Sequence, residues 1–386
     1  MNNFKPVILC LSGIAIMLTS CNKNEGLNSG NGHVNYDALY VVNGAGNSIS
    51  VINLSTNEVQ KTIDLGALTP VTGNNIMGGD GSNNMMWPYH ISLSPDKSKL
   101  AISEPGMDFS GSYDMMQVIS TSGSSTDIHT QHHNGTANVM QMEGKILILD
   151  AITGDLLKEL TLEGMPHNAI FSTDGKEIWT AIMMPEGKII VFDADSYNLL
   201  TTISVGNMPS GITFSDDGKK AFVANAMSGS VTVIDAVKKL VAETIFSGQE
   251  PVGVWPGMNS MMYVDNEKDQ TISVINTMNN MMTDSIKTGF TPGMVIRNTI
   301  MNQMWVSDPA AAKIHFWTQT VTGFTYGGSV SVGKGAGAII FSQTGNTGYV
   351  TNQEENTVSV IDLTGLKELL KIPVGKKPNS LIIRYK

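Results

Sequence analysis

The sequence predicts an all-β protein, a seven-bladed β-propeller with four-stranded blades, and three observations support this fold class. A phrase of about 42 residues recurs along the chain, its strands alternate apolar and polar residues, and its last copy is cut short. The clearest copy covers residues 209–235 and holds a proline, a short apolar strand, an Asp-Gly turn and two further strands. Repeats of about 40 to 45 residues with four short strands are typical of propeller blades.

The starts of the repeats set the number of blades. From the second start onward, consecutive starts lie 41 to 44 residues apart, whereas the first two are 78 residues apart. No helical periodicity of comparable strength accompanies them. The starts are Pro88, Pro166, Pro209, Pro251, Pro292, Ala336 and Pro378. They predict seven blades, with an insertion in the blade that opens first.

The last repeat predicts how the ring closes. Pro378 opens a strand at 380–384, and the sequence stops two residues later. The strands missing from this repeat are found near the other end, at 38–43, 48–53 and 58–63. We expect the C-terminal strand to join these three, because closure removes the exposed sheet edges of an open array.

Two tetrapeptides relate the repeat to a known family. Residues 349–352 read Tyr-Val-Thr-Asn and residues 222–225 read Phe-Val-Ala-Asn. The phrase resembles the YVTN-family β-propeller repeat, and the resemblance covers residues 36–386. Two blades depart from the pattern, with phrases that end at Asp265 and Asp308. The resemblance implies the fold and an extracytoplasmic setting more than an activity, because propellers serve many functions.

The first residues predict export and a lipid anchor. Lys5 precedes an apolar run at 7–18, which suits a signal-peptide core and is too short to span a bilayer. The run ends in Leu-Thr-Ser-Cys21, which resembles the lipobox of bacterial lipoproteins. The resemblance implies cleavage after residue 20 and attachment to the lipid bilayer through acylated Cys21. The alternative is an ordinary secretory signal with a chance cysteine.

These features divide the chain into three parts. Residues 1–20 form the signal peptide, 21–35 a flexible tether rich in Asn and Gly, and 36–386 the propeller. Asn22 replaces the Asp that retains some lipoproteins in the inner membrane. We therefore expect an outer-membrane lipoprotein of the cell envelope, facing the periplasm or the surface.

Charge and cysteine content exclude several classes of function. The net charge is −10, and removal of residues 1–20 takes away only Lys5, so the mature chain is at −11. Such an acidic chain is a poor partner for nucleic acid. The only cysteines are Cys10 and Cys21, so the mature domain has no disulfide, no thiolate metal ligand and no Cys-x-x-Cys-His haem site.

An insertion at about 104–144 separates two strands that should be adjacent, at 99–103 and 145–150. Loops of this length are functional or disordered as a rule. Because blade strands alternate in direction, the insertion leaves the ring on the same face as the connections that enter each blade. That rim therefore collects most of the histidines and about half of the mature methionines.

Imidazole and thioether groups on one rim form a ligand set that suits copper, with thioethers favouring Cu(I). The candidate ligands are His90, His129, His132, His133, His167, Met85, Met86, Met165 and Met183. A structural interpretation competes, because methionine also fills irregular gaps in cores and Met281 and Met282 fall on the opposite face. In addition, aligned blades place His90 and His167 one residue out of register.

The sequence favours a binding module over an enzyme, since no spacing requires an acid–base pair. The expected function is binding of a protein or small-molecule ligand through the central opening and the insertion-bearing rim. An extracytoplasmic copper-binding protein is the first alternative, and a propeller hydrolase or quinoprotein is the second. The tryptophans are core candidates, except that Trp87 could line a ligand mouth.

Overall fold

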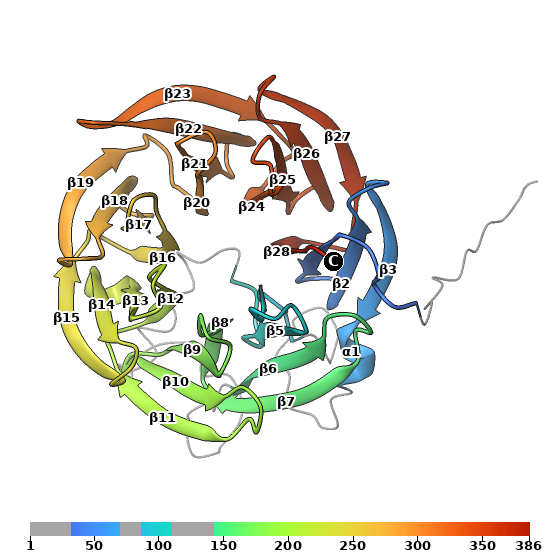
Figure 1. Cartoon of the computed structure of the whole chain (residues 1–386), viewed down its shortest axis with the longest axis horizontal. Helices are drawn as coiled ribbons and strands as arrows, with labels where there is room; N and C mark the ends of the chain where they lie inside the picture. Colours follow the sequence, from blue (N-terminus) through green and yellow to red (C-terminus); the bar gives the residue numbers. More distant parts are fainter. Residues whose placement is uncertain (1–31, 70–85, 110–142) are drawn as a thin grey trace, which may run out of the picture.

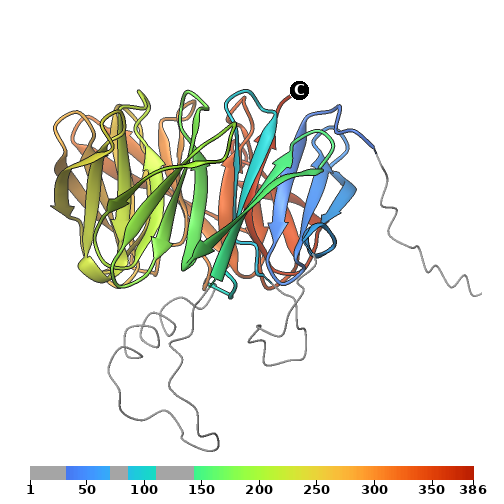
Figure 2. The same cartoon turned by 90° about the horizontal axis from the view of Figure 1, so that it is seen from below.

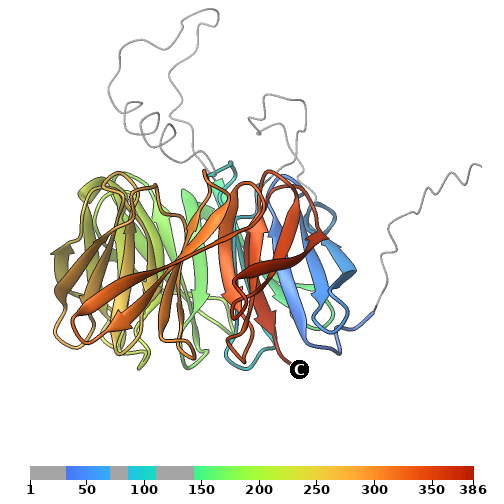
Figure 3. The same cartoon turned by 90° about the horizontal axis from the view of Figure 1, so that it is seen from above.

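The computed structural model describes residues 32–69, 86–109 and 143–386. Within them, the strands form seven four-stranded antiparallel sheets in a ring (Figure 1), so the predicted seven-bladed β-propeller is confirmed. Figures 2 and 3 show the ring from two sides, with the strands of each blade running between its two faces. No helix in the described ranges is long and apolar enough to cross a membrane.

Each blade is one antiparallel sheet with its first strand at the ring axis. Blade one contains β28 (Pro378–Arg384), β1 (Ala38–Asn43), β2 (Ser48–Asn53) and β3 (Glu58–Asp64). Blade two contains β4 (His90–Leu93), β5 (Lys99–Glu104), β6 (Glu143–Asp150) and β7 (Leu156–Glu163). Blade three contains β8 (Met165–Phe171), β9 (Glu177–Met183), β10 (Lys188–Asp193) and β11 (Leu199–Ser204). Blade four contains β12 (Pro209–Phe214), β13 (Lys220–Asn225), β14 (Ser230–Asp235) and β15 (Leu240–Phe246).

The other three blades repeat this order. Blade five contains β16 (Pro251–Pro256), β17 (Met261–Asn266), β18 (Thr271–Asn276) and β19 (Met281–Lys287). Blade six contains β20 (Val295–Asn298), β21 (Gln303–Asp308), β22 (Lys313–Thr320) and β23 (Gly323–Ser331). Blade seven contains β24 (Ala336–Phe341), β25 (Thr347–Asn352), β26 (Thr357–Asp362) and β27 (Lys367–Pro373). Two short helices interrupt the described strands, α1 (Leu65–Leu68) and the 3-10 turn η1 (Ala226–Ser228).

The ring closes as the sequence predicts. β28 pairs antiparallel with β1, and Arg384 lies opposite Ala38. The Arg384 guanidinium donates to the carbonyl of Lys97 in blade two (3.0 Å) and to that of Val34 (3.2 Å). The last strand therefore completes the sheet begun by the first and also holds blade two, which leaves no open edge at the junction.

The apolar core lies between adjacent blades and is built from the second and third strands. β1, β13 and β25 are buried over almost their whole length, whereas the outer strand β15 is exposed at all but one residue. The largest fully buried side chains include Trp179 and Trp305. Each such apolar side chain contributes about 1.5 to 3 kcal/mol on burial, so the packing between blades holds the ring together.

The Asn of the repeated tetrapeptide has a structural role. Asn352 Nδ2 donates to Thr357 Oγ1 (2.9 Å) and to Ser359 Oγ (2.8 Å), five and seven residues later. Its Oδ1 accepts from the N–H of Gly333 (3.0 Å), where a Cβ atom would collide with the Asn side chain. Similar pairs to hydroxyls at these spacings are made by Asn43, Asn225 and Asn266. We call this arrangement the Asn clamp.

The clamp explains which blades depart from the repeat. In blade five β17 continues one residue past Asp265, and Asn266 forms the clamp, so this blade follows the pattern more closely than its sequence suggests. In blades two, three and six the equivalent position holds Glu104, Ile182 and Asp308. These three blades are the ones that lack the clamp Asn.

Candidate functional site

A cavity of about 620 Å³ lies along the ring axis, bordered by the first strands of several blades. Its lining comes mainly from β4, β16, β20, β24 and β28. Figure 1 labels the last four of these strands around the centre of the ring. Most of the lining is apolar, with a small number of polar groups among it. Cavities of this size and character are the usual form of small-molecule sites.

Three aromatic rings meet at one part of the wall. Tyr89 contacts His167 edge to face, with ring centroids 4.9 Å apart, and contacts Phe109 in the same way at 5.3 Å. Phe109 and His167 are stacked at 5.9 Å. An ion pair from Lys377 to Asp108 fixes the residue next to Phe109. His167 is therefore held between two aromatic rings at the cavity wall.

Ser103 of β5 positions the two histidines. Its hydroxyl accepts from the backbone N–H of His90 (3.3 Å) and donates to the carbonyl of His167 (2.9 Å). Its carbonyl accepts from the N–H of Tyr89 (2.9 Å). One residue of the second strand thus ties the start of β4 to β8, and both imidazoles line the same cavity despite the offset between their blades.

Both imidazoles are neutral at physiological pH. Burial lowers the pKa of His90 to about 4, and burial together with the nearby His90 lowers the pKa of His167 to about 3. Within the described part of the chain, the Nδ1 atom of neither ring has a hydrogen-bond partner. His90 is only half-buried by surface area, because solvent reaches it through the cavity while protein surrounds it on all sides.

An acidic group faces the cavity from blade five. Asp265 is 2% exposed, and its carboxyl accepts from the indole Nε1 of Trp255 (2.6 Å) and the N–H of Gly253 (3.0 Å). Burial, and after it the charge of Glu267, raises the pKa of Asp265 well above its ordinary value. Tyr89 lines the same cavity as Asp265 and Glu267. Burial is the main cause that raises the pKa of Tyr89, and the negative charges of Glu267 and Asp265 raise it further.

Arg297 is the only Lys or Arg among the described residues that line the cavity. Its guanidinium makes two 2.7 Å hydrogen bonds to the carboxylate of Asp216 and also donates to the carbonyl of Gly257. The one strong cation on the wall is therefore already paired.

The structure separates the candidate copper ligands into two groups. His90 and His167 share the cavity, whereas Met165 and Met183 are buried in an apolar cluster with Phe109 and are not on its wall. Met86 is also buried. In the described residues, no group of three or more His, Cys, Asp or Glu side chains has the spacing of a metal site. Four candidates lie outside the described residues: Met85, His129, His132 and His133.

Sequence reasoning missed the acidic part of the wall. The repeat pattern predicts that Asp265 ends an imperfect repeat and that Trp255 is a core residue. The signal that could have found Asp265 is its place in the repeat, since the equivalent position holds Ser103, Ser307 or Thr351 in three other blades.

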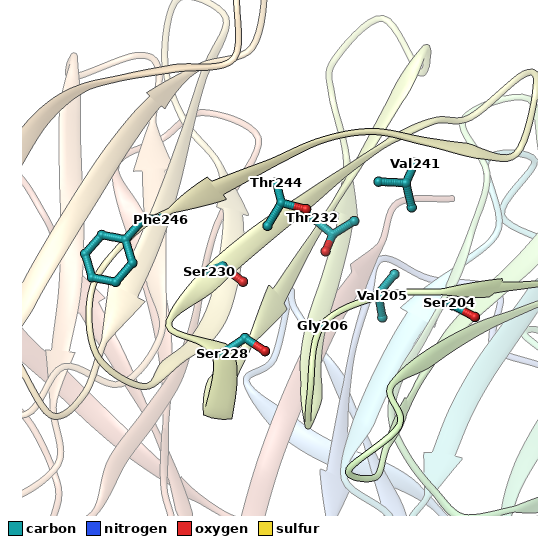
Figure 4. A pocket seen from close by; sticks show the side chains of 9 residues that line it. All are labelled: Ser204, Val205, Gly206, Ser228, Ser230, Thr232, Val241, Thr244 and Phe246. Carbon is teal, nitrogen blue, oxygen red and sulfur yellow. The ribbon is translucent and has the colours of Figure 1, made fainter.

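A second hollow of about 620 Å³ lies at the periphery, between β11 and the outer strands of blade four (Figure 4). Its lining has hydroxyl and aliphatic groups and no titratable side chain. The lining residues are Ser204, Val205, Gly206, Ser228, Ser230, Thr232, Val241, Thr244 and Phe246. The lining of this groove holds no charged side chain, and the axial cavity is the stronger candidate site.

Comparison with solved structures supports the class of protein, a seven-bladed β-propeller. A functionally unknown protein from Desulfotomaculum acetoxidans has a TM-score of 0.65 at 12% identity, over 90% of this chain and 99% of that one. The periplasmic gluconolactonase of Pseudomonas aeruginosa has a TM-score of 0.62 at 16% sequence identity, and the match covers 90% of this chain and 98% of the gluconolactonase. Kuenenia stuttgartiensis hydrazine synthase has a TM-score of 0.60 at 15% sequence identity, and the match covers 81% of this chain and 99% of the synthase chain.

At these identities the likeness concerns the fold alone. No protein-family model matches the sequence, and no curated protein is similar to it in sequence. The particular function must therefore be argued from the cavity.

Proposed function

We propose that this protein is a lipid-anchored β-propeller of the cell envelope that binds a small ligand in its axial cavity. The observation that carries the proposal is the convergence of polar side chains from three blades on one cavity. His90, His167 and Asp265 bring polar groups from blades two, three and five to a wall that is otherwise mostly apolar. A few convergent polar groups in an apolar cavity give a ligand both affinity and orientation.

The cell-envelope setting rests on the sequence. The signal-like residues 1–20, the lipobox ending in Cys21 and the resemblance to YVTN repeats all support an exported, anchored protein. A structural neighbour described as periplasmic is consistent with this setting for such a ring. Labelling with a radioactive fatty acid tests the anchor, since Cys21→Ala should abolish incorporation.

Blocking the cavity tests the binding function. Ala338 lines the cavity, and Ala338→Phe should fill part of it, whereas Val237→Phe adds the same ring to an outer turn where Val237 is 75% exposed. We would measure binding of the neutral probe 3,3-dimethylbutan-1-ol to the full chain by saturation-transfer NMR. Binding lost in the first variant and kept in the second supports the proposal. Equal binding by both variants would place the probe elsewhere and reject it.

Copper binding is the second candidate, because His90 and His167 share one cavity and their Nδ1 atoms lack partners in the described residues. Imidazole nitrogen is a good copper ligand. Metal analysis after Cu(I) titration would compare the full chain with the His90→Ala/His167→Ala variant and with His33→Ala, which removes an exposed histidine. Stoichiometric copper that only the double variant loses supports this function. Equal, weak uptake by all three proteins contradicts it.

A further inference from the structure

The internal repeat singles out Asp265 as an unusual residue. The equivalent position in blade seven is Thr351, whose hydroxyl accepts from the N–H of Ala338 (2.9 Å). In blade five Asp265 accepts from Gly253, the residue equivalent to Ala338 (3.0 Å). A neutral hydroxyl therefore suffices for the structural hydrogen bond. The carboxyl of Asp265 therefore adds an ionisable group to the cavity wall, although the backbone hydrogen bond does not require one.

The surroundings of Asp265 are shaped to hold a carboxyl group. Trp255 Nε1 donates to its Oδ1 (2.6 Å), in addition to the backbone bond to Oδ2. A Cβ atom at Gly253 would collide with both Asp265 and Trp255, so only glycine leaves room for this pair. The carboxyl is thus fixed by two donors in a wall that lies against the cavity.

Among the described residues that line the cavity, no Lys or Arg is paired with Asp265. The acidic neighbour Glu267 disfavours the charged form of Asp265, as burial does, and Arg297 is engaged with Asp216. An ionised Asp265 would therefore be costly until a positive charge enters the cavity. A bound cation would supply that charge, and the proton of Asp265 would pass to water.

The rest of the wall suits an organic cation better than a bare metal ion. Trp255, Tyr89 and Phe109 present aromatic rings to the cavity, and aromatic faces attract alkylammonium groups. His167 is 9% exposed, and its ring is neutral with an unpartnered Nδ1 in the described residues. In the same residues no group of three or more His, Cys, Asp or Glu side chains could hold a metal ion.

We propose that the axial cavity selects a compact organic ammonium ion, whose charge is met by Asp265 and whose alkyl surface contacts the aromatic wall. The inference rests on the proposed ligand-binding function and names its ligand class. Anions are disfavoured by Asp265 and Glu267, while neutral molecules of the same shape lack the attraction to the carboxylate.

The test compares two probes of equal shape, choline and its neutral carbon isostere 3,3-dimethylbutan-1-ol. Their dissociation constants would be measured by titration calorimetry on the full chain. The variants are Asp265→Asn, Asp265→Thr, which copies Thr351, and Asp195→Asn, which removes a 92% exposed charge from an outer turn. Thermal melts would show whether each variant folds. If one of the two Asp265 variants fails to fold, the other is sufficient for the comparison.

The expected result is that choline binds at least tenfold tighter than the isostere in the wild type and in Asp195→Asn. This preference should disappear in the Asp265 variants. Equal binding of both probes to the wild type would overturn the cation inference and leave small-molecule binding intact. A preference that persists in the Asp265 variants would also overturn it. If neither probe binds, the inference and the proposed function both fail.

Discussion

The rings of Tyr89 and His167 meet edge to face, with centroids 4.9 Å apart and ring planes inclined by 64°. Phe109 covers the imidazole as well, so the ring is shielded by two aromatic side chains. Such contacts contribute about 0.5 to 1.5 kcal/mol each beyond the burial of area. They connect blade two, which carries Tyr89, with blade three, which carries His167.

Removing this cover should change the titration of His167. Its pKa is about 3 because burial disfavours the imidazolium, so its ring signals should stay constant from pH 8 down to pH 5. In Tyr89→Ala water reaches the ring, and its pKa should move up toward the ordinary value of 6.5. NMR titration of the histidine ring protons measures this. Tyr89→Phe keeps the contact and should behave as the wild type, and an unchanged pKa in Tyr89→Ala would contradict the account.

Glu104 should make stability fall as the pH rises. It is fully buried, neither carboxyl oxygen has a partner among the described residues, and burial raises its pKa to about 8 from the ordinary 4.5. Between these values the folded chain keeps the proton while the unfolded chain releases it, so the free energy of unfolding declines from pH 4.5 to 8. Glu104→Gln should remove this slope and stabilise the protein by roughly 4 kcal/mol at pH 8.

Urea denaturation at pH 5 and pH 8 measures the slope for Glu104. The matched control is Glu143→Gln, an exposed position at the start of the adjacent strand β6, which should leave the slope as it is. A wild-type protein that gains stability between pH 5 and pH 8, with the gain unaffected by Glu104→Gln, would refute the assignment.

The Asn clamp should contribute several times more to the free energy of unfolding than an exposed Asn side chain does. Asn352→Ala removes the 3.0 Å acceptor of the Gly333 N–H and the donor to the hydroxyls of Thr357 and Ser359, so we expect a loss of about 2 to 3 kcal/mol. Asn207→Ala, at an exposed position of an inter-blade connection, should change stability by less than about 0.5 kcal/mol. Equal losses in the two variants, measured by denaturant unfolding, would mean that the clamp is not a stabilising element.

His315 of blade six should titrate below the normal range. It occupies the position of the second clamp hydroxyl, 3.4 Å from Asp308 Oδ2 and 3.1 Å from the Tyr326 hydroxyl. Burial lowers its pKa, and the charge of Asp308 opposes this shift. Asp308→Asn should therefore lower the pKa of His315 further, as followed by NMR, and a rise would be inconsistent with the pairing. Because the folded pKa is lowered, the stability due to His315 is lost as pH falls below about 6.5.

The fold could be predicted from the sequence because its signal is repeated. A period of about 42 residues, present in several copies, overrides the ambiguity of any single short strand. Even the closure between β28 and β1 could be inferred, since the incomplete repeat at Pro378 matches the strands that begin at Ala38. The clamp was visible only as a recurring Asn, because its hydroxyl partners lie five and seven residues away on the next strand.

The cavity wall was harder to predict. His90 and His167 could be assigned to one rim from topology, but the pairing of Asp265 with Trp255 depends on a register shift between Pro251 and Gly253 in β16. Such a shift redirects side chains, and no local pattern of apolar and polar residues encodes it. The methionines were ambiguous for a different reason. A thioether group can bind a metal or pack in an apolar core, and the structure places Met165 and Met183 in an apolar cluster.

The hydrogen bonds of Val34 fix the face of the ring at which the N-terminal segment joins it. Its N–H donates to the carbonyl of Ile152 in the turn between β6 and β7 (2.9 Å), and its carbonyl accepts from Arg384 at the end of β28. Both partners lie on the face of the ring opposite the starts of β4 and β8, where Tyr89 and His167 are found. With the proposed lipid on Cys21, the tether would therefore join the ring at the face opposite Tyr89 and His167. The connections that carry these two residues would then be free of the tether, and a solute could approach them without crossing its attachment point.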